Sequence, residues 1–278
     1  MSASVISFIN MKGGVGKTTL CISIGEYLAN YKDKKVLIID IDPQFNATQS
    51  ILSKYKRIDE YLDDHLANTK TIRRIFETKS SLTDTVQPVT PDEIIVEISD
   101  HLDMIFGDIN TIFDIEQPAA RLNKLKRFIA EHNLRDTYDF ILIDSPPTIS
   151  LFTDAALVAS DYYLVPVKID HYSILGATSL LSVINNIKDT YVHPNIKNLG
   201  FIYTNTQESL TLKTRRMKNR FERTEPFNDL YFFDNRFNFV QDLMVGGKGN
   251  IASSYKLSRK YIIDICNEFI SRIDELEE

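Results

Sequence analysis

The stretch that decides the fold is Met11-Lys12-Gly13-Gly14-Val15-Gly16-Lys17-Thr18-Thr19. It follows an apolar run at residues 4–9, which predicts a buried strand, and leads into residues 17–31, where apolar side chains recur at helical spacing. A glycine-rich loop between a strand and a helix is the setting of a phosphate-binding loop. Its backbone N–H groups can surround phosphate oxygens, Lys17 can reach the terminal phosphates, and the Thr18 hydroxyl can ligate Mg²⁺. We therefore predict a nucleotide site formed by residues 12–19.

Four more apolar runs predict further strands, at residues 35–39, 140–143, 162–167 and 199–204. Helical spacing predicts helices at residues 173–190, at 208–222 and, near the end of the chain, at 253–275. Continuous apolar strands separated by helices are typical of a mostly parallel sheet that is covered by helices on both faces. The predicted fold class is therefore α/β.

Residues 50–135 are rich in charge and predict less regular structure. Helices are expected near 57–78 and 118–133, together with an extended pair at 93–98 and 102–106. The sequence contains no internal repeat, low-complexity tract or flexible linker. We therefore expect one nucleotide-binding domain over residues 1–278, with an elaborated, mainly helical middle.

The composition is that of an ordinary globular chain, because 43% of the residues are apolar, 25% are charged, and the formal net charge is −6. A membrane span needs about 18 or more consecutive apolar residues, and the sequence has no such run. Cys21 and Cys266 are too few for a disulfide framework or a zinc cluster. No secretory signal is recognisable, so we expect a cytoplasmic protein.

Carboxylates follow two of the predicted strands, and each group precedes a proline. Asp40 and Asp42 come before Pro43, and Asp144 comes before Ser145-Pro146-Pro147. The carboxyl ends of the strands of an open α/β sheet form the edge where ligands bind. These aspartates are therefore candidates for chemistry beside the phosphate loop, although an aspartate at a strand end can also serve only as a turn residue.

The loop departs from the standard pattern, because Met11 stands where the first glycine is expected and is followed by a second lysine, Lys12. It resembles the loop of the ParA/MinD family of deviant Walker ATPases, which reads Lys-Gly-Gly-x-Gly-Lys-Thr-Thr. The motif Asp40-Ile41-Asp42-Pro43-Gln44 and the strand end at 141–147 match the same family. The resemblance implies a P-loop ATPase that uses ATP and Mg²⁺ and forms a homodimer around two ATP molecules.

The resemblance also implies roles for single residues. Lys12 would reach across the dimer to the partner's nucleotide, Asp42 would lie near the attacking water and the Mg²⁺ ion, and Asp144 would hold Mg²⁺, usually through water. Asp40 would support them, and either Asn205 or Thr204 would contact adenine. The implied catalytic residues are Lys12, Lys17 and Asp42. The implied nucleotide ligands are Lys12, Gly13, Gly14, Val15, Gly16, Lys17, Thr18, Thr19 and Asn205, and the implied metal ligands are Thr18, Asp42 and Asp144.

The family includes DNA-segregation ATPases, membrane-bound division-site ATPases, the nitrogenase iron protein and bacterial tyrosine kinases. The positions of Cys21 and Cys266 do not suit a shared iron–sulfur cluster, and the acidic residues 274–278 do not suit a basic membrane helix. Beyond residue 255 only Tyr261 is a tyrosine, whereas the kinases carry a tyrosine cluster there. DNA segregation without membrane contact is therefore the favoured class.

A basic stretch at residues 213–223 supports this class, because it holds six basic residues and one acidic residue in a chain that is acidic overall. On a helix these side chains would form a positive face that suits phosphate backbones and reads no bases. The plain alternative is a solvated helix face. The candidate DNA-binding residues are Lys213, Arg215, Arg216, Lys218, Arg220 and Arg223, with Lys256, Arg259 and Lys260 as a group that could extend them.

The resulting prediction is a ParA-type ATPase, cytoplasmic and associated with the nucleoid, that forms an ATP dimer, binds DNA non-specifically and drives plasmid or chromosome partition. The expected partner is a ParB-like activator bound to a centromere-like site. No N-terminal helix-turn-helix domain is expected, since the first predicted strand begins at residue 4. The alternatives are a related ATPase that positions a protein cargo, a MinD-like division-site ATPase, and a nucleotide switch without turnover.

Two other patterns are interpreted as structural. Gly246-Gly247-Lys248-Gly249 has no following Lys-Thr pair, so we expect a flexible turn. The five histidines lack the spacing of metal ligands.

Overall fold

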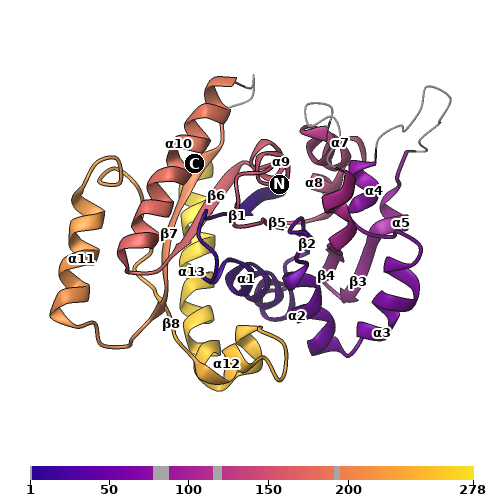
Figure 1. Ribbon diagram of the computed structural model, residues 1–278. Coiled ribbons are helices and arrows are strands. Elements are labelled where there is room, and N and C mark those ends of the chain that lie inside the picture. The colour runs from indigo at the N-terminus through magenta and orange to yellow at the C-terminus, as the bar shows by residue number, and fades with distance from the viewer. Residues whose placement is uncertain (1, 78–87, 115–120, 191–194) are drawn as a thin grey trace.

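The computed structural model describes residues 2–77, 88–114, 121–190 and 195–278, and in these residues eight strands form one sheet (Figure 1). The strand order is β3-β4-β2-β5-β1-β6-β7-β8. Every neighbouring pair is parallel except β3 and β4. The predicted α/β class with a mostly parallel sheet is confirmed. The strands are β1 (Ser4–Phe8), β2 (Val36–Asp40), β3 (Ile95–Ser99), β4 (Leu102–Ile105), β5 (Phe140–Asp144), β6 (Tyr162–Val167), β7 (Lys197–Thr206) and β8 (Phe237–Asn238).

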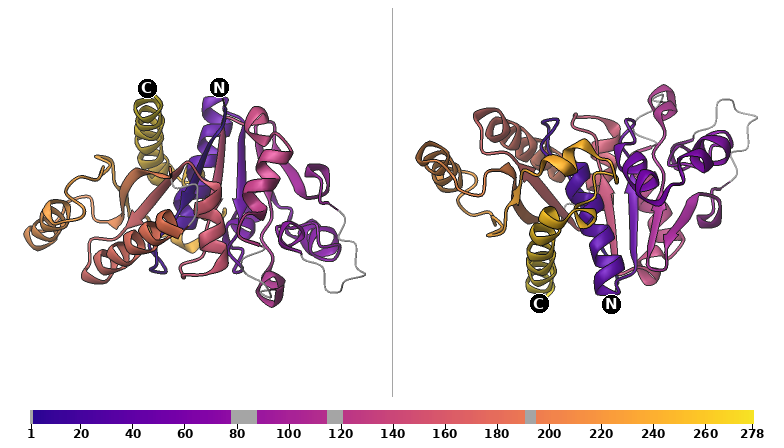
Figure 2. Two further views of the ribbon diagram at one scale, coloured as in Figure 1. Left: turned by 90° about the horizontal axis from the view of Figure 1, so that it is seen from above. Right: turned by 90° about the horizontal axis from the view of Figure 1, so that it is seen from below.

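Helices cover both faces of the sheet, as Figure 2 shows from above and from below. The longer helices are α1 (Lys17–Lys32), α2 (Asn46–Tyr55), α7 (Lys124–Glu131), α9 (Leu151–Ala159), α10 (His171–Thr190), α11 (Leu212–Arg223) and α13 (Lys256–Glu277). The shorter ones are α3 (Ile58–Glu60), the π-helix η1 (Tyr61–Leu66), α4 (Arg73–Phe76), α5 (Pro91–Ile94), the 3₁₀ turn η2 (Ile109–Asp114), α8 (Leu134–Thr137), α12 (Gln241–Val245) and the 3₁₀ turn η3 (Ala252–Ser254).

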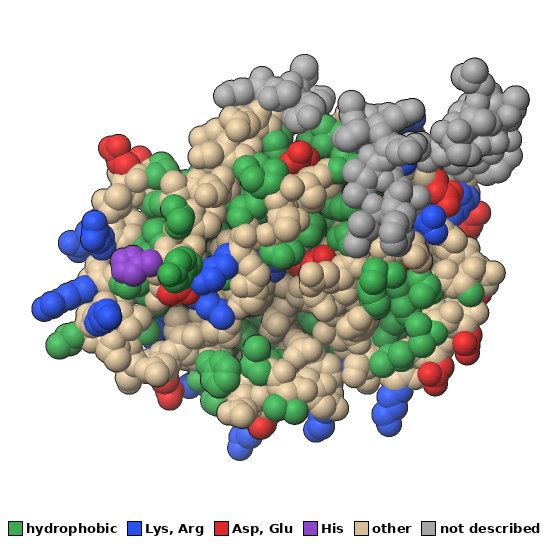
Figure 3. Space-filling view, viewed as in Figure 1, with side chains coloured by type: hydrophobic (Ala, Val, Ile, Leu, Met, Phe, Trp, Pro, Cys, Tyr) green, Lys and Arg blue, Asp and Glu red, His purple; other side chains and the backbone are tan. Residues whose placement is uncertain are grey.

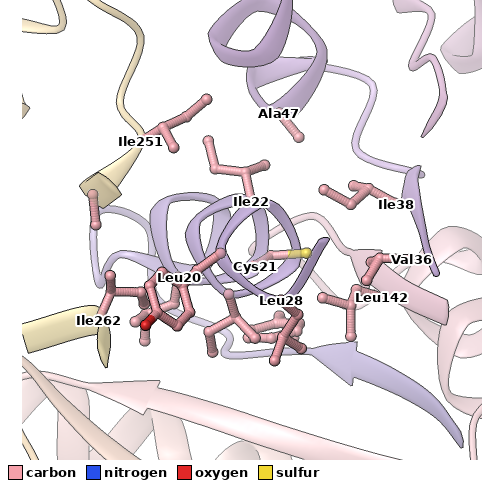
Figure 4. Packing of buried hydrophobic residues seen from close by; sticks show 14 of the residues in the cluster. Leu20, Cys21, Ile22, Leu28, Val36, Ile38, Ala47, Leu142, Ile251 and Ile262 are labelled. Carbon is pink, nitrogen blue, oxygen red and sulfur yellow. The ribbon is translucent and has the colours of Figure 1, made fainter. Parts of the chain in front are cut away.

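The core follows the two-residue period of the strands. Ile38 of β2 and Leu142 of β5 face α1, α2 and α13, whereas Leu37 and Ile141 face α4, α7, α8 and α9 on the other side of the sheet. Beyond β1, the second face is covered by α10 and α11. Figure 4 shows how α1 is enclosed, because its side chains lie between the strands on one side and α2 and the C-terminal segment on the other.

The direction of the strands places their carboxyl ends along one edge of the sheet. The start of β1 and the end of α13 lie together at the opposite edge, where the hydroxyl of Ser4 donates to Glu277 at 2.6 Å. Asp161 joins the amino ends of the strands there, since it accepts from the N–H of Val5 and pairs with Arg135. The loops that can bind a ligand are therefore gathered on the side that faces the viewer in Figure 1.

The middle of the chain differs most from expectation. The helix predicted over 57–78 is divided in two. α3 continues without a break into η1 over residues 58–66, and the chain then turns at Thr69, whose backbone is left-handed with φ 54°, before α4 begins. The extended pair is an antiparallel hairpin of β3 and β4. Of the helix predicted over 118–133, residues 118–120 lie outside the described ranges, and the described helix α7 runs from Lys124 to Glu131.

Candidate functional site

The phosphate loop connects β1 to α1 and contacts the end of β7 on its way. Gly14 and Gly16 have positive φ values of 69° and 84°, a conformation that glycine adopts without strain. The Thr204 hydroxyl donates to the carbonyl of Val15 at 2.6 Å, and the Asn205 amide lies 3.4 Å from the carbonyl of Gly14. The end of β7 therefore supports the loop from behind.

Lys17 begins α1 and is only 7% exposed. Burial lowers the pKa of its ammonium group, while the carboxylates of Asp144 and Asp42 act in the opposite direction. A buried cation at the start of a helix, beside a glycine-rich loop, is suited to hold an anion such as a phosphate.

Asp144 ends β5 directly beside the loop. Its Oδ2 accepts from the Thr18 hydroxyl at 2.7 Å, whereas its buried Oδ1 has no hydrogen-bond partner in the described residues. Burial raises the pKa of Asp144 above the ordinary range of a carboxyl group, and the charge of Lys17 opposes that rise. An orphaned buried carboxylate oxygen next to a threonine hydroxyl is the arrangement that an added cation would complete.

Asp40 ends β2 and Asp42 lies two residues further along the chain, but the two have different surroundings. Asp40 is fully buried, and its Oδ2 accepts from both the N–H and the hydroxyl of Thr48 at 2.8 Å. Asp42 is 4% exposed, and its Oδ1 accepts from the N–H of Gln44 at 2.9 Å. Burial raises the pKa of both carboxyls. Asp40 is thus occupied within the protein, and Asp42 is the one that lines the cavity described next.

The site opens into a cavity of about 730 Å³ beside the loop. Its phosphate end is lined by Gly13, Gly14, Gly16, Lys17, Thr18, Thr19 and Asp42. Thr204 and Asn205 lie on the wall, so both candidates for the adenine contact reach it. Its outer part is lined by residues that the sequence did not suggest, among them Gln49, Phe237, Asn238, Val240 and Met244. The segment from β8 to α12 therefore forms one wall of the cavity, and no sequence motif predicts it.

A divalent cation fits this chemistry. Mg²⁺ is usually bound by one or two protein oxygens together with phosphate oxygens and water. Thr18 and Asp144 supply such oxygens next to the cradle for phosphate, with Asp42 on the same cavity. No group of three or more His, Cys, Asp or Glu side chains within the described ranges is arranged to hold a metal by itself.

Lys12 lies at the other end of the loop and has a different environment. Its Nζ donates to both carboxylate oxygens of Asp170, at 2.8 and 3.0 Å, and to the Ser173 hydroxyl at 3.1 Å. Its backbone N–H donates to the Asn10 side chain at 2.9 Å, and Asn10 in turn donates to the carbonyl of Pro166. The reach of Lys12 to a partner subunit stays a prediction. In the single chain this lysine is held at the start of α10.

The basic stretch forms α11, which stands at one side of the molecule in Figure 1. It is anchored through the buried ring of Phe221, which packs on Phe201, Phe227 and Phe232. Figure 3 shows several blue side chains projecting from this side of the molecule, and others elsewhere on the same face. The exposed basic residues are Lys213, Arg215, Arg216, Arg220 and Arg223.

Lys218 differs from those five residues. It is partly buried, its Nζ donates to Glu222 at 2.6 Å, and it lies 5.2 Å from the centroid of the Tyr203 ring. The helix periodicity that groups it with the arginines does not reveal that it faces the sheet. Arg259 is also engaged within the chain, since it donates to the carbonyl of Ser253 at 2.8 Å.

The second glycine cluster forms a turn after α12. Gly246 and Gly249 have φ values of 72° and 70°, and the N–H of Gly249 donates to the carbonyl of Gly246 at 3.0 Å. A Cβ atom on Gly249 would lie 2.4 Å from the carbonyl oxygen of Ser50, so the turn presses directly on α2. This contact closes the outer part of the cavity, which Gly246 and Gly249 both line.

Asn10, Thr48 and Asp170 are further polar residues around the site that sequence reasoning missed. Asp170 had a usable signal, because it follows a predicted strand of a parallel sheet, as Asp42 and Asp144 do. Asn10 and Thr48 have none, since each is a single polar residue whose partner is known only from the fold.

Both the sequence and the fold are similar to those of known proteins. The family model described as AAA_31, an AAA domain, matches residues 3–198. The chain is 32% identical over 200 residues to the virulence plasmid ParA family protein pGP5-D of Chlamydia psittaci, which covers 72% of this chain and 68% of that protein.

Solved structures share the fold. A plasmid partition protein from Borrelia burgdorferi aligns with a TM-score of 0.71 at 20% identity, over 98% of this chain and 100% of the other. Cobyrinic acid a,c-diamide synthase from Mycobacterium smegmatis, solved with an ATP analog and magnesium, aligns with a TM-score of 0.68 at 24% identity, over 88% of this chain and 90% of the other. No helix in the described part of the chain is both long and apolar enough to span a membrane.

Proposed function

Because the chain belongs to the ParA family of P-loop ATPases, we propose that it hydrolyses ATP with Mg²⁺ and uses this reaction to control a dimer that binds DNA and partitions a plasmid or chromosome. The observation that carries the proposal is one cavity that joins Lys17, Thr18 and Asp42 beside the unpartnered oxygen of Asp144. A solved neighbour of the same fold holds an ATP analog and magnesium.

Each group in the cavity has a distinct task in this proposal. The N–H groups of residues 13–17 and the ammonium of Lys17 bind the phosphates and stabilise the charge that develops on them. Thr18 and Asp144 hold the Mg²⁺ ion, which neutralises charge on the β- and γ-phosphates when it is bound. Asp42 accepts a hydrogen bond from the attacking water and orients it. Asp42 is suited to this because the cavity reaches its carboxylate, whereas Thr48 occupies that of Asp40.

Lys12 couples nucleotide to assembly in this proposal. It lies outside the set of residues that line the cavity, on the exposed side of the loop. In a two-fold dimer around two ATP molecules, each Lys12 leaves Asp170 and contacts the partner's phosphates. Dimerisation then depends on bound ATP, because the phosphates replace the carboxylate as the counter-charge.

The five exposed basic residues of α11 are the proposed DNA contact. They form one positive surface, and none of them makes an ion pair with another residue in the described ranges, so their charge is available to phosphates. Two copies in a dimer double that surface. A ParB-like activator bound to a centromere-like site would accelerate hydrolysis and release the DNA.

The experiment that tests the proposal compares the wild type with Asp42→Ala, in the presence of Mg²⁺, ATP and double-stranded DNA. We expect the variant to bind ATP within a few-fold of the wild type and to release phosphate at least about a hundredfold more slowly. Asp59→Ala is the matched control, since Asp59 is an exposed aspartate on α3. Phosphate release at the wild-type rate by folded Asp42→Ala would contradict the role of Asp42.

The same variant tests assembly and DNA binding, because ATP persists on it. Light scattering should detect a dimer with ATP and a monomer with ADP, and only the dimer should retain DNA of unrelated sequences. A dimer that leaves DNA unbound would favour the alternative of a protein cargo. Absence of ATP binding by the wild type would reject the whole proposal.

A further inference from the structure

Phe45 is a strained residue in the loop that carries Asp42. Its backbone is left-handed with φ 44°, a conformation that disfavours any residue with a side chain by about 1–2 kcal/mol. Its N–H donates to the carbonyl of Asp42 at 2.8 Å, and its carbonyl accepts from the N–H of Gln49 at 3.0 Å. The turn that starts α2 is therefore closed around Asp42. Such strain persists only where the surrounding structure holds it.

Tyr61, from the π-helix η1, holds the ring of Phe45. The two rings are stacked with their centroids 5.9 Å apart, and Phe106 packs edge-on against Tyr61 at 5.6 Å. Tyr61 is 2% exposed, and its hydroxyl donates to the carbonyl of Gly107 at 2.9 Å. Both the ring and the hydroxyl of Tyr61 are thus fixed.

Gly107, directly after β4 and Phe106, completes the arrangement from a third segment of the chain. Its N–H donates to the Thr48 hydroxyl at 2.8 Å, and Thr48 in turn donates to Asp40. A Cβ atom on Gly107 would lie 2.7 Å from the Cβ of Phe45 and 3.0 Å from the Cγ of Asp40. The backbone of Gly107 therefore touches the Asp42 loop directly.

We propose that Phe45 and Tyr61 are positioning residues that hold the Asp42 loop in the geometry that hydrolysis requires. The inference rests on the proposed function, because it assigns a task to these aromatics within the same reaction. Two observations separate them from ordinary core packing. Phe45 is strained and only partly buried, and both rings line the cavity that Asp42 lines. The middle of the chain, which carried no motif, thereby supports the active loop.

Three variants test the brace formed by Phe45 and Tyr61. Phe45→Gly removes the ring and relieves the left-handed backbone, Tyr61→Leu removes the stacked ring, and Tyr61→Phe keeps the ring and removes only the hydroxyl. Tyr31→Leu is the matched control, since Tyr31 is 47% exposed on α1. Circular dichroism and thermal unfolding establish that each variant folds. Phe45→Gly is the one best able to fold, because strain relief offsets the lost contacts.

The readout is the division of the effect between kcat and KM for ATP. Phe45→Gly and Tyr61→Leu should lower kcat by between about tenfold and a hundredfold, because a shift of the order of 1 Å in a reacting group has that effect. KM and the affinity for a fluorescent ATP analogue should stay within about threefold, since the phosphate loop is untouched. Tyr61→Phe should retain most of the wild-type kcat, and Tyr31→Leu all of it.

Amide hydrogen exchange over residues 40–48 gives a second readout that needs no turnover. We expect faster exchange there in Phe45→Gly and Tyr61→Leu than in the wild type, with unchanged exchange in β1 and β5. Wild-type kcat in both variants, or wild-type exchange in the loop, would overturn the proposal. Failure of the wild type to hydrolyse ATP would instead reject the proposed function, and hydrogen exchange would still decide whether the brace holds the loop.

Discussion

Lys12 and Lys17 lie at the two ends of one loop, yet they differ in burial and in the carboxylates that balance their charge. Lys17 is buried, with its charge balanced by the nearby carboxylates of Asp42 and Asp144. Lys12 keeps a side chain that is 31% exposed, and its counter-charge, Asp170, is also partly exposed. The fold fixes the position of Lys17, whereas the partner of Lys12 can be exchanged. One loop therefore combines a permanent ligand-binding cation with a cation whose contacts can change on assembly.

The largest expected effect separates the two lysines directly. Lys17→Ala should weaken ATP binding by at least about a hundredfold, or about 3 kcal/mol, because it leaves the phosphates without their buried cation. Lys12→Ala should leave the affinity of the single chain for ATP within about threefold. Titration of each variant with a fluorescent ATP analogue measures both values. Similar losses in the two variants would remove the distinction between them.

Asp144→Asn tests how the buried charges around Lys17 are balanced. Because burial raises the pKa of Asp144 in the folded chain, the wild type loses stability as pH rises from about 4 through the raised pKa. Asparagine does not titrate, so the free energy of unfolding of the variant should rise relative to that of the wild type between pH 5 and pH 8. We expect a gain on the order of 2 kcal/mol in the free energy of unfolding, measured by urea titration without nucleotide.

The same variant should lose the stabilisation that Mg²⁺ and ATP together give the wild type. This control separates the pH-dependent gain in stability from the loss of ligand binding, because only the latter depends on Mg²⁺ and ATP. A difference between the proteins that is equal at pH 5 and pH 8 would mean that Asp144 does not carry the destabilising charge.

A smaller effect is expected at Lys12. Asp170→Asn weakens the ion pair that holds this lysine, and an exposed pair of this kind contributes about 0–1 kcal/mol. The ATP concentration at which half the protein is dimeric should therefore fall by up to about fivefold. Light scattering in the Asp42→Ala background measures it, with Asp59→Asn as the control. A rise in that concentration would mean that Asp170 assists the dimer instead of competing with it.

The smallest effect concerns a similar contrast on α11. Arg216 is exposed, whereas Lys218 is held by Glu222 and Tyr203. Arg216→Ala should reduce the slope of log K against log salt for DNA by about 0.9, the value for one lost phosphate contact. Lys218→Ala should change that slope less and lower the thermal stability slightly. Equal changes in slope for the two variants would mean that Lys218 contacts DNA phosphates as Arg216 does.

The sequence predicts those parts of the site whose residues lie together in a short motif. The phosphate loop, the strand ends and Asp144 follow from short motifs, and their strands and helices lie close to the expected ranges. The contact of Lys12 with Asp170 joins residues 158 positions apart, and that of Tyr61 with Gly107 joins residues 46 apart. Such contacts depend on how the strands are ordered in the sheet, and no local pattern encodes them.

The middle of the chain was predicted least well for a related reason. A charged stretch with helical spacing indicates one helix, yet the turn at Thr69 separates the continuous segment of α3 and η1 from α4, while Tyr61 of η1 packs on Phe106. The two-residue strand β8 and the helix α12 were not predicted at all, because they are too short to show a period. Tertiary contacts decide the structure of such segments.

The close contact between Gly249 and the backbone of Ser50 restricts which residues the fold tolerates at position 249. Gly247, two residues earlier, has open space around its Cα, whereas any side chain at Gly249 would collide with the backbone of α2. In a library that randomises both positions, selection for nucleotide binding should accept many residues at 247 and return glycine at 249. Two positions only two residues apart therefore differ sharply in mutational tolerance, and the difference arises from a segment almost two hundred residues away.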